Sequence, residues 1–543
     1  MQQAATAPQP PAPAPATQTH APELWFYYST NLQVTDNLKP LEAVWRRAAA
    51  AGYTQVLLTD SKFAKLDSVE PVYFENAAKV KKLAGDLHLE IVPAVFPMGW
   101  SEALLAHNPN LVESLPVRGA LFVVKNGVAQ PAPEPGETLA FPDGGFFNVK
   151  HWSYADPAVQ MENGVAHAAP GGGKNARAML KLKLTPFHQY HIRVGIRTQG
   201  FSGPALVQVL PEGGGDAELN YATLDVKATQ YWRDYDVVFN SLDHSAVTIS
   251  FRAGWDDSKG EVWWRNPMIE PAGLLNIVRR PSAPLSVSVD EAGWEVKEGQ
   301  YFDPVIDPKM GRTPWPGAYD VWHEPPVMKM RNMPDGTRLS VSFFHAITTD
   351  DGKVMITPSE PQTVDLLRDE AKRVDALWHP KRWFMEHDEI RVLGWDPADE
   401  ARKLDAGPLL ADNLRTCTKI LRELNPQAKL YVWSDMFDPN HNAHDHYYLA
   451  KGSYKGSWEG LDPSVIVANW NFDKWEQSLA WFTGRGNKQL IAGYYDSDPG
   501  KITDLLRRAD DKNGIEAVMY TTWENKYGDL EKFAAAARSF RNK

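Results

Sequence analysis

Three apolar segments decide the fold: "LWFYYST" at residues 24–30, "TQVLLTDS" at 54–61 and "LEIVPAVFP" at 89–97. Two stretches with helical periodicity separate them, "NLKPLEAVWRRAAAAGY" and then "YFENAAKVKKLAGDLH". Strands that are apolar almost throughout, rather than at alternate positions, are typical of sheets buried on both faces. Because these strands alternate with amphipathic helices, the segment predicts a βαβαβ unit in which helices cover a parallel sheet.

The pattern changes between residues 137 and 272, where hardly any helical period remains. Short alternating segments such as "YHIRVGIRT", "ALVQVLP" and "AVTISFRAGW" follow one another with Gly and Pro between them. This pattern predicts an antiparallel β-sandwich. Together with the closing "GEVWWRNPMIEP", it resembles the jelly-roll carbohydrate-binding modules. The alternative is a packing or spacer domain whose aromatic residues all belong to the core.

The alternation of strands and helices resumes after a Pro-rich stretch that ends near residue 336. Further strands are expected at 338–348, 382–389, 429–437, 464–472, 488–497 and 516–524. This makes nine candidates where a barrel closes with eight, so one must lie outside, either 338–348 or 24–30. A doubly wound open sheet is the alternative, but the chain has no Gly-rich phosphate-binding turn to support it.

We therefore expect an α/β protein, a (β/α)8 TIM-type barrel interrupted by an inserted antiparallel β-sandwich of jelly-roll type. The expected organisation is a disordered Ala/Pro-rich tract at 1–22, a first part of the barrel at 23–136, the sandwich at 137–272 and the remainder of the barrel at 273–543.

Composition excludes several classes of protein. The net charge of −11 is spread along the chain without a basic stripe, so nucleic acid is not an expected partner. No apolar run approaches the roughly 20 residues that span a bilayer. Cys417 is the only cysteine, so the chain has no cysteine-based metal site and no internal disulfide. The N-terminal Ala/Pro/Gln tract is of the kind that follows a removed signal or anchor, and we expect a secreted or periplasmic bacterial protein. The oligomeric state stays open.

Acids and aromatic residues stand at the ends of successive expected strands, where a barrel places its active residues. In chain order these are Asp60, His387, Asp388, Glu389, Trp433, Asp435, Trp470, Tyr494, Tyr495, Asp496, Trp523 and Glu524. A funnel lined with carboxylates and indoles suits cleavage of a glycosidic bond. It offers an acid for the leaving oxygen, a group that stabilises positive charge at the anomeric carbon, and flat faces for the sugar. An oligo- or polysaccharide is therefore the expected substrate, and no cofactor or metal is expected.

This ordered set resembles the family 20 glycoside hydrolases, the β-N-acetylhexosaminidases. The matching text is "HDE" (387–389), "WSDMFD" (433–438), "NW" (469–470), "YYD" (494–496) and "TTWE" (521–524). The glycines that the family places before its Asp-Glu pair are absent, "FPMGW" replaces its Pro-Gly-His, and the first strand lacks its sugar-gripping arginine. The identity of the sugar therefore stays open.

The resemblance implies a retaining, exo-acting hydrolase that uses substrate-assisted catalysis. Glu389 would be the general acid, and Asp388 would orient the substrate's own 2-acetamido group, which attacks the anomeric carbon. Tyr494 or Tyr495 would bind the acetamido oxygen, with Tyr495 favoured. Trp470 and Trp523 would wall the pocket, while Glu524 and Asp435 would hold sugar hydroxyls; the remaining strand-end residues, Asp60, His387, Trp433 and Asp496, complete the expected substrate-binding set.

Several alternatives remain open at this stage. A glycosidase of other specificity would use a protein nucleophile, either Glu524, Asp496 or Asp435, and a decayed barrel would bind glycans without turnover. The Asp-Glu pair alone could be a salt-bridged strand end, with Arg391 or Arg382 as its partner. The loop "DMFDPNHNAHDHYY" could bind a divalent ion, but we expect its His441 and His444 to donate hydrogen bonds to sugar hydroxyls.

Overall fold

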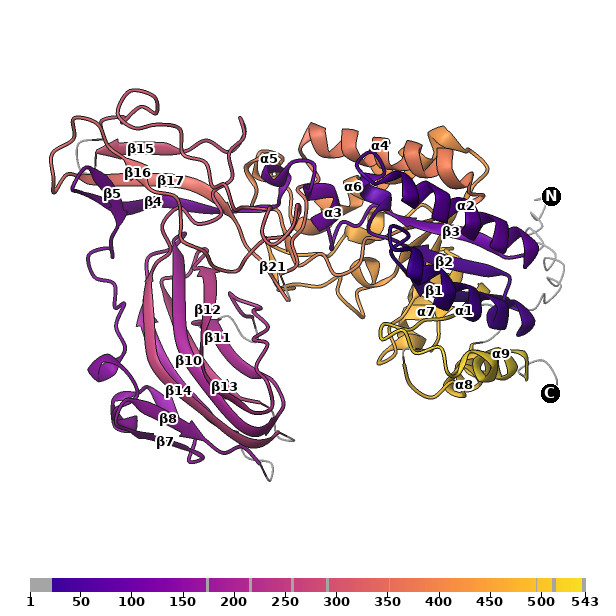
Figure 1. Cartoon of the computed structure of the whole chain (residues 1–543), viewed down its shortest axis with the longest axis horizontal. Coiled ribbons are helices and arrows are strands. Elements are labelled where there is room, and N and C mark those ends of the chain that lie inside the picture. The colour runs from indigo at the N-terminus through magenta and orange to yellow at the C-terminus, as the bar shows by residue number, and fades with distance from the viewer. Residues whose placement is uncertain are drawn as a thin grey trace, which may run out of the picture.

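Eight parallel strands close into a barrel at one end of the elongated molecule (Figure 1). The computed structural model describes residues 22–171, 175–213, 217–254, 258–289, 293–350, 352–494, 496–509 and 514–539. Around the barrel the strands are β1 (Glu23–Ser29), β2 (Gln55–Thr59), β3 (Glu90–Val95), β18 (Arg382–Met385), β20 (Lys429–Trp433), β22 (Val465–Asn469), β23 (Gln489–Ala492) and β24 (Ile515–Tyr520). The first strand pairs with the last, Trp25 opposite Met519, which closes the ring.

Helices pack around the outside of this barrel (Figure 1). They are α1 (Leu38–Ala50), α2 (Pro71–Asp86), α4 (Pro361–Trp378), α6 (Ala406–Leu424), α7 (Trp475–Gly484), α8 (Lys501–Arg508) and α9 (Leu530–Ser539), with the short α3 (Glu102–Leu105) and α5 (Pro397–Glu400) on the loops. Inside the barrel, side chains from alternate strand positions such as Trp25, Phe384 and Tyr431 form one apolar core. Because both faces of each strand are covered, the strands are apolar nearly throughout, as the sequence predicts.

The chain leaves the barrel after β3 and returns at β18, and the segment between them, residues 96–381, is called the excursion. Within it, two antiparallel sheets of five and four strands pack face to face. Phe251 contacts Trp264 across them with ring centroids 6.3 Å apart. The strands are β6 (Tyr154–Ala155), β7 (Val159–Glu162), β8 (Val165–Ala168), β9 (Arg177–Lys183), β10 (Gln189–Ser202), β11 (Ala205–Pro211), β12 (Gln230–Asn240), β13 (Ala246–Ala253) and β14 (Lys259–Pro271). The predicted combination of a parallel barrel with an antiparallel β-sandwich is thus confirmed at this level of detail.

A further five-stranded sheet lies beside the sandwich (Figure 1) and was not separated from the barrel in the sequence interpretation. In spatial order its strands are β15 (Ser286–Val289), β17 (Arg338–Ala346), β4 (Ser114–Lys125), β5 (Val128–Pro131) and β16 (Met328–Lys329). The candidate at 338–348 is therefore the one outside the barrel, and the candidate at 24–30 is β1. Strands β4 and β5 fall within 23–136, and β15 to β17 within 273–543, so neither of those ranges consists of barrel alone.

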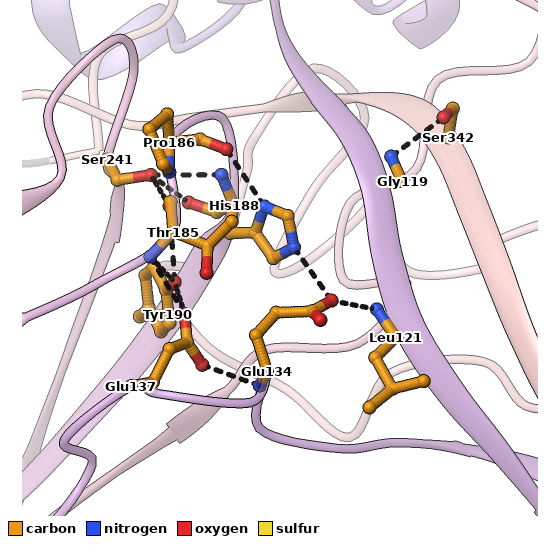
Figure 2. Close-up of polar contacts among 10 residues, drawn as sticks. All are labelled: Gly119, Leu121, Glu134, Glu137, Thr185, Pro186, His188, Tyr190, Ser241 and Ser342. Atoms are coloured by element: carbon orange, nitrogen blue, oxygen red, sulfur yellow. Dashed lines mark hydrogen bonds and ion pairs between the residues drawn. The ribbon is translucent and has the colours of Figure 1, made fainter. Parts of the chain in front are cut away.

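Polar contacts fasten the sandwich to this separate sheet (Figure 2). The Glu134 carboxylate accepts a hydrogen bond from the Leu121 backbone N–H of β4 at 2.7 Å and lies 3.3 Å from His188 Nε2. The Glu137 carboxylate accepts one from the Thr185 N–H at 2.9 Å and another from the Tyr190 hydroxyl of β10. Glu134 therefore bridges the separate sheet and the sandwich, and Glu137 holds the same connection against the sandwich. Across the described ranges, no helix combines the length and apolarity needed to cross a membrane.

Candidate active site

A cavity of about 890 Å³ opens at the C-terminal end of the barrel. Residues on or just after seven of the eight strands line it, in chain order Tyr27, Thr59, Ala94, Glu386, Asp388, Glu389, Trp433, Trp470 and Trp523. The segment after β2 and helix α4 also contribute to the wall, and loops of the excursion add Trp100, Trp315, Tyr319 and Lys353. This is the end of a (β/α) barrel at which active residues are carried.

Asp388 and Glu389 reach the cavity together because strand β18 has already ended at Met385. In a continuing strand, neighbouring side chains would point to opposite faces. Here Glu389 adopts a left-handed backbone conformation with φ 49°, and its N–H donates to Asp435 Oδ2 at 2.9 Å. Backbone strain in a non-glycine residue at a functional turn must be held by its surroundings.

Gly99, in the "FPMGW" loop after β3, supports this turn. A Cβ atom at Gly99 would lie 1.9 Å from the Asp388 carbonyl oxygen, so only a glycine lets the two backbones approach this closely. The loop also donates the Met98 N–H to the Glu386 carbonyl at 2.9 Å, and Glu386 N–H donates to Val95 at 2.8 Å. The loops after β3 and β18 are thus joined beyond their paired strands.

The surroundings raise the pKa of both carboxyls. Burial, followed by the nearby Asp435, Glu386 and Glu389, raises the pKa of Asp388 well above its usual value. Burial also raises the pKa of Glu389, although Arg391, 2.8 Å from its carboxylate, opposes this. The ion pair with Arg391 that the sequence allowed is therefore present, and it occurs inside the cavity wall.

Asp435 lies beneath the cavity and organises it. Its carboxylate accepts hydrogen bonds from the Glu389 N–H, from Asn442 Nδ2 at 2.9 Å and from Trp470 Nε1 at 3.3 Å. These three donors leave little capacity for a sugar hydroxyl, and Asp435 is itself fully buried. Its position fixes both the Glu389 turn and the Trp470 ring.

Three indoles, Trp433, Trp470 and Trp523, line the cavity together with the carboxyl groups. Trp523 is 41% exposed, and its ring lies 5.2 Å from that of Tyr27 and 5.7 Å from that of Trp433. Trp470 completes the set through its bond to Asp435. Indole faces beside carboxyl groups are a suitable surface for a sugar ring.

Other expected site residues support loops. Asp60 borders the cavity, but its carboxylate accepts from the Leu32 N–H at 2.9 Å, the Lys62 N–H at 2.9 Å and the Tyr73 hydroxyl at 3.2 Å. His387 is buried against helix α6, with Nε2 3.0 Å from Asn413 Oδ1, and burial lowers its pKa to about 4.

Three candidates that follow β23 and β24 do not line the cavity either: Tyr494, Asp496 and Glu524. Asp496 accepts from the Thr522 hydroxyl, from the Trp523 N–H at 2.7 Å and from the Glu524 N–H at 3.2 Å, so it holds the Trp523 turn. Glu524 is exposed and pairs with Lys526. Tyr494 stacks on Tyr520 with its hydroxyl 3.2 Å from Asp529 Oδ2.

Three expected residues remain. Tyr495 lies outside the described residues. His441 packs edge-on against Trp470 with ring centroids 4.5 Å apart, just behind the cavity wall. His444 is exposed, with Nδ1 2.7 Å from the Asp445 carbonyl oxygen. Within the described ranges no three His, Cys, Asp or Glu side chains gather as a metal site would require.

The sequence interpretation missed three carboxyls that line the cavity, Glu102, Glu370 and Glu386. Glu102 lies 3.7 Å from Lys353 Nζ. Burial raises the pKa of Glu386 to about 7. Burial, opposed by hydrogen bonds from the Phe96 N–H, raises the pKa of Glu370 to about 8. Glu386 is one residue from the quoted "HDE", whereas Glu370 comes from helix α4, where only its place beside the apolar Leu367 and Ala371 hinted at burial.

Comparisons with known proteins give low similarity throughout. No family model and no curated protein matches the chain. Solved structures that share part of the fold include a rhamnosidase from Novosphingobium sp. PP1Y, with 11% identity over 96% of this chain and 59% of that chain and a TM-score of 0.32. A chitobiase from Flavobacterium johnsoniae has 16% identity over 34% of this chain and 29% of that chain, with a TM-score of 0.25. A family 29 carbohydrate-binding module has 18% identity over 28% of this chain and 89% of that one, with a TM-score of 0.17. These values are too low to assign a family or an activity.

Proposed function

We propose that the chain is a glycoside hydrolase whose active site is the cavity at the end of the barrel. One observation carries the proposal: Asp388 and Glu389 line the same cavity as Trp433, Trp470 and Trp523. Carboxyl groups with raised pKa values supply an acid for the leaving oxygen, and indole faces bind sugar rings. The substrate is an oligo- or polysaccharide, and export from a bacterial cell is part of the proposal.

In this proposal Glu389 is the general acid. It protonates the glycosidic oxygen, and Arg391, 2.8 Å away, then stabilises the carboxylate that remains. Asp388 orients a 2-acetamido group on the substrate, whose carbonyl oxygen attacks the anomeric carbon and gives retention. The enzyme would then be an exo-acting β-N-acetylhexosaminidase.

Glu386 supports a second candidate mechanism. It lines the cavity, and burial raises its pKa to about 7, a value suited to a general acid at neutral pH. Glu386 would then protonate the leaving oxygen, and Asp388 or Glu389 would attack as a protein nucleophile. The sugar would then need no acetamido group. Glu524, Asp496 and Asp435 do not border the cavity, so they are poorly placed for attack.

Two substitutions separate these mechanisms. We expect Glu389→Gln to lower kcat on an aryl N-acetylglucosaminide by about 10²–10⁴-fold, because removing a general acid costs about that much. Glu386→Gln should lower it by less than about tenfold. The reverse order of effects would assign the acid to Glu386, and activity retained in both variants would rule out the proposed function.

The identity of the sugar is tested with a panel of aryl glycosides: N-acetylglucosaminide, N-acetylgalactosaminide, glucoside, galactoside and mannoside. A thiazoline derived from N-acetylglucosamine should inhibit strongly only if the substrate's acetamido group is the nucleophile. Turnover of the glucoside or galactoside without thiazoline inhibition would favour a protein nucleophile. Glycan binding without turnover of any glycoside would favour a non-catalytic binding protein.

A further inference from the structure

The wall of the cavity next to strand β2 carries two lysines, whereas its floor carries carboxyl groups. Lys62 and Lys65 line the cavity from the segment that follows β2, and both side chains are half-buried. Strand β18 contributes Glu386, Asp388 and Glu389 to the same cavity. One cavity therefore carries ammonium groups on one side and carboxyl groups on another.

Neither lysine is neutralised by the protein. Lys62 Nζ lies 3.4 Å from the Ser61 hydroxyl, and in the part of the chain that the structure describes no carboxylate forms an ion pair with either ammonium. The nearby Asp67 pairs with His107 and Arg373 instead. Asp60 directs its carboxylate to the Leu32 and Lys62 backbone and to Tyr73.

Different charged groups shift the pKa of Asp388 on the floor and the pKa of Lys65 on the wall. After burial, the groups that raise the pKa of Asp388 are Asp435, Glu386 and Glu389. Burial and the adjacent Lys62 lower the pKa of Lys65, and Asp60 opposes this. Burial raises the pKa of Asp60, and Lys62 opposes this, so Asp60 is the acid on which the lysine side of the cavity acts. Two half-buried ammonium groups that form no ion pair within the described residues can bind an anion that a ligand brings to them.

A firmly held loop completes this side of the cavity. Trp315 is 62% exposed and lines the cavity beside Pro314 and Pro316. Gly317, at φ 95°, brings the loop against helix α3, since a Cβ atom there would lie 1.8 Å from the Glu102 carbonyl oxygen. The Tyr319 hydroxyl donates to the Pro109 carbonyl at 2.6 Å. An exposed indole on a fixed loop can stack on a sugar ring at little entropic cost.

We propose that Lys62, Lys65 and Trp315 form a subsite for an acidic sugar, one that carries a carboxylate or sulfate group, next to the sugar held over Asp388 and Glu389. The substrate class is then an acidic glycan. This inference rests on the proposed function of the same cavity. The lysines bind the anionic substituent, and the indole packs on the ring that bears it.

The test compares three disaccharides that share the cleaved sugar and differ in the leaving sugar, which is neutral, carries a carboxylate or carries a sulfate. We expect the wild-type protein to cleave one acidic disaccharide with a kcat/KM about tenfold above that of the neutral one. Lys62→Met and Lys65→Met keep an apolar stem and remove the charge. Each should lower this preference by about three- to tenfold through KM, with the neutral substrate unaffected.

The matched control is Lys39→Met, on the exposed surface of α1, which should change neither substrate. Raising NaCl from about 50 to about 500 mM should reduce the wild-type preference, because salt screens the ammonium charges. The preferred acidic disaccharide identifies whether the anion is a carboxylate or a sulfate.

Two outcomes reject the subsite and leave the hydrolase proposal standing. One is equal kcat/KM values for the neutral and acidic disaccharides, and the other is Met variants that slow both substrates equally. Failure to cleave any disaccharide, together with calorimetric binding of the acidic one that Lys65→Met weakens, would support the subsite and reject the hydrolase.

Discussion

At the scale of single residues, the cavity holds more carboxyl groups than its chemistry requires, and Glu370 is the least expected. It is 1% exposed, it accepts the Phe96 N–H at 3.3 Å, and it belongs to a helix rather than to a strand end. Burial raises its pKa to about 8, and the nearby Glu386 adds to the shift. The folded protein therefore raises the pKa of Glu370 to about 8 and that of Glu386 to about 7, whereas both carboxyls have a pKa of 4.5 in the unfolded chain.

This difference predicts how stability depends on pH. Between about pH 4.5 and 8 these two carboxyls bind more protons in the folded state than in the unfolded state, so their contribution to the free energy of unfolding falls as pH rises. Glu370→Gln removes the titrating group and keeps an acceptor for Phe96. We expect it to stabilise the protein at pH 8.5 by about 2–4 kcal/mol, with little effect at pH 5, as measured by denaturant unfolding.

Asp365→Asn is the control for this substitution. Asp365 lies on the exposed side of the same helix, 3.6 Å from Arg368, so its replacement should shift stability equally at both pH values. A Glu370→Gln protein with the pH dependence of the wild type would show that Glu370 is ionised in the folded state.

At the scale of elements, the turn after β18 depends on the loop after β3. Gly99 contacts the Asp388 carbonyl more closely than any residue with a Cβ atom could. The left-handed Glu389 and the left-handed Phe96, at φ 62°, stand on the two sides of this contact. The position of the carboxyl groups thus depends on a residue that carries no chemistry of its own.

Gly99→Ala should therefore displace the turn without unfolding the barrel. We expect kcat/KM to fall by at least about 100-fold, since a shift of about 1 Å at a reacting group costs that much, and stability to fall by about 1–3 kcal/mol. Gly85→Ala is the matched control, because α2 has open space at that position. That variant should be fully active and slightly stabilised. Unchanged activity in Gly99→Ala would show that the turn adapts.

Among the elements, the barrel strands could be predicted from the sequence and strand β4 could not. The barrel strands were predictable because their apolar runs lie between amphipathic helices. Strand β4 was not, since Pro116 and the left-handed Gly119 (φ 67°) interrupt its pattern, and each normally argues against a strand interior. Its pairing with β17 absorbs the irregularity through a register shift between Val341 and Phe343.

Of the residues predicted from strand ends, Asp60, Asp388, Glu389, Trp433, Trp470 and Trp523 line the cavity. The prediction was less successful for their neighbours. Where the chain turns, a step of one residue changes the direction of the side chain, and the sequence does not show where that happens. Glu524 therefore points to solvent beside Trp523, and Glu386, not His387, joins Asp388 in the cavity.

At the scale of the whole molecule, the excursion between β3 and β18 divides the barrel into two parts of the chain. Strand β3 pairs with β18, and β1 pairs with β24 near the end of the sequence. By contrast, the sandwich strands β9 to β14 pair with one another, all within residues 177–271. Contacts between distant segments form slowly because the intervening loop must first be closed.

Refolding should therefore occur in two stages. Pulsed hydrogen exchange is expected to protect the amides of β10, β12 and β14 before those of β1, β18 and β24. Simultaneous protection of both groups would show that the molecule folds as one cooperative unit.

The same connectivity has a consequence during synthesis. Strands β1 to β3 leave the ribosome first, with their edges unpaired until β18 and β24 have been made. Unpaired edges of apolar strands invite pairing with other chains. We expect the excursion to fold before the barrel closes and to bring its two ends together. Strand β18 then emerges close to the edge of β3 with which it pairs.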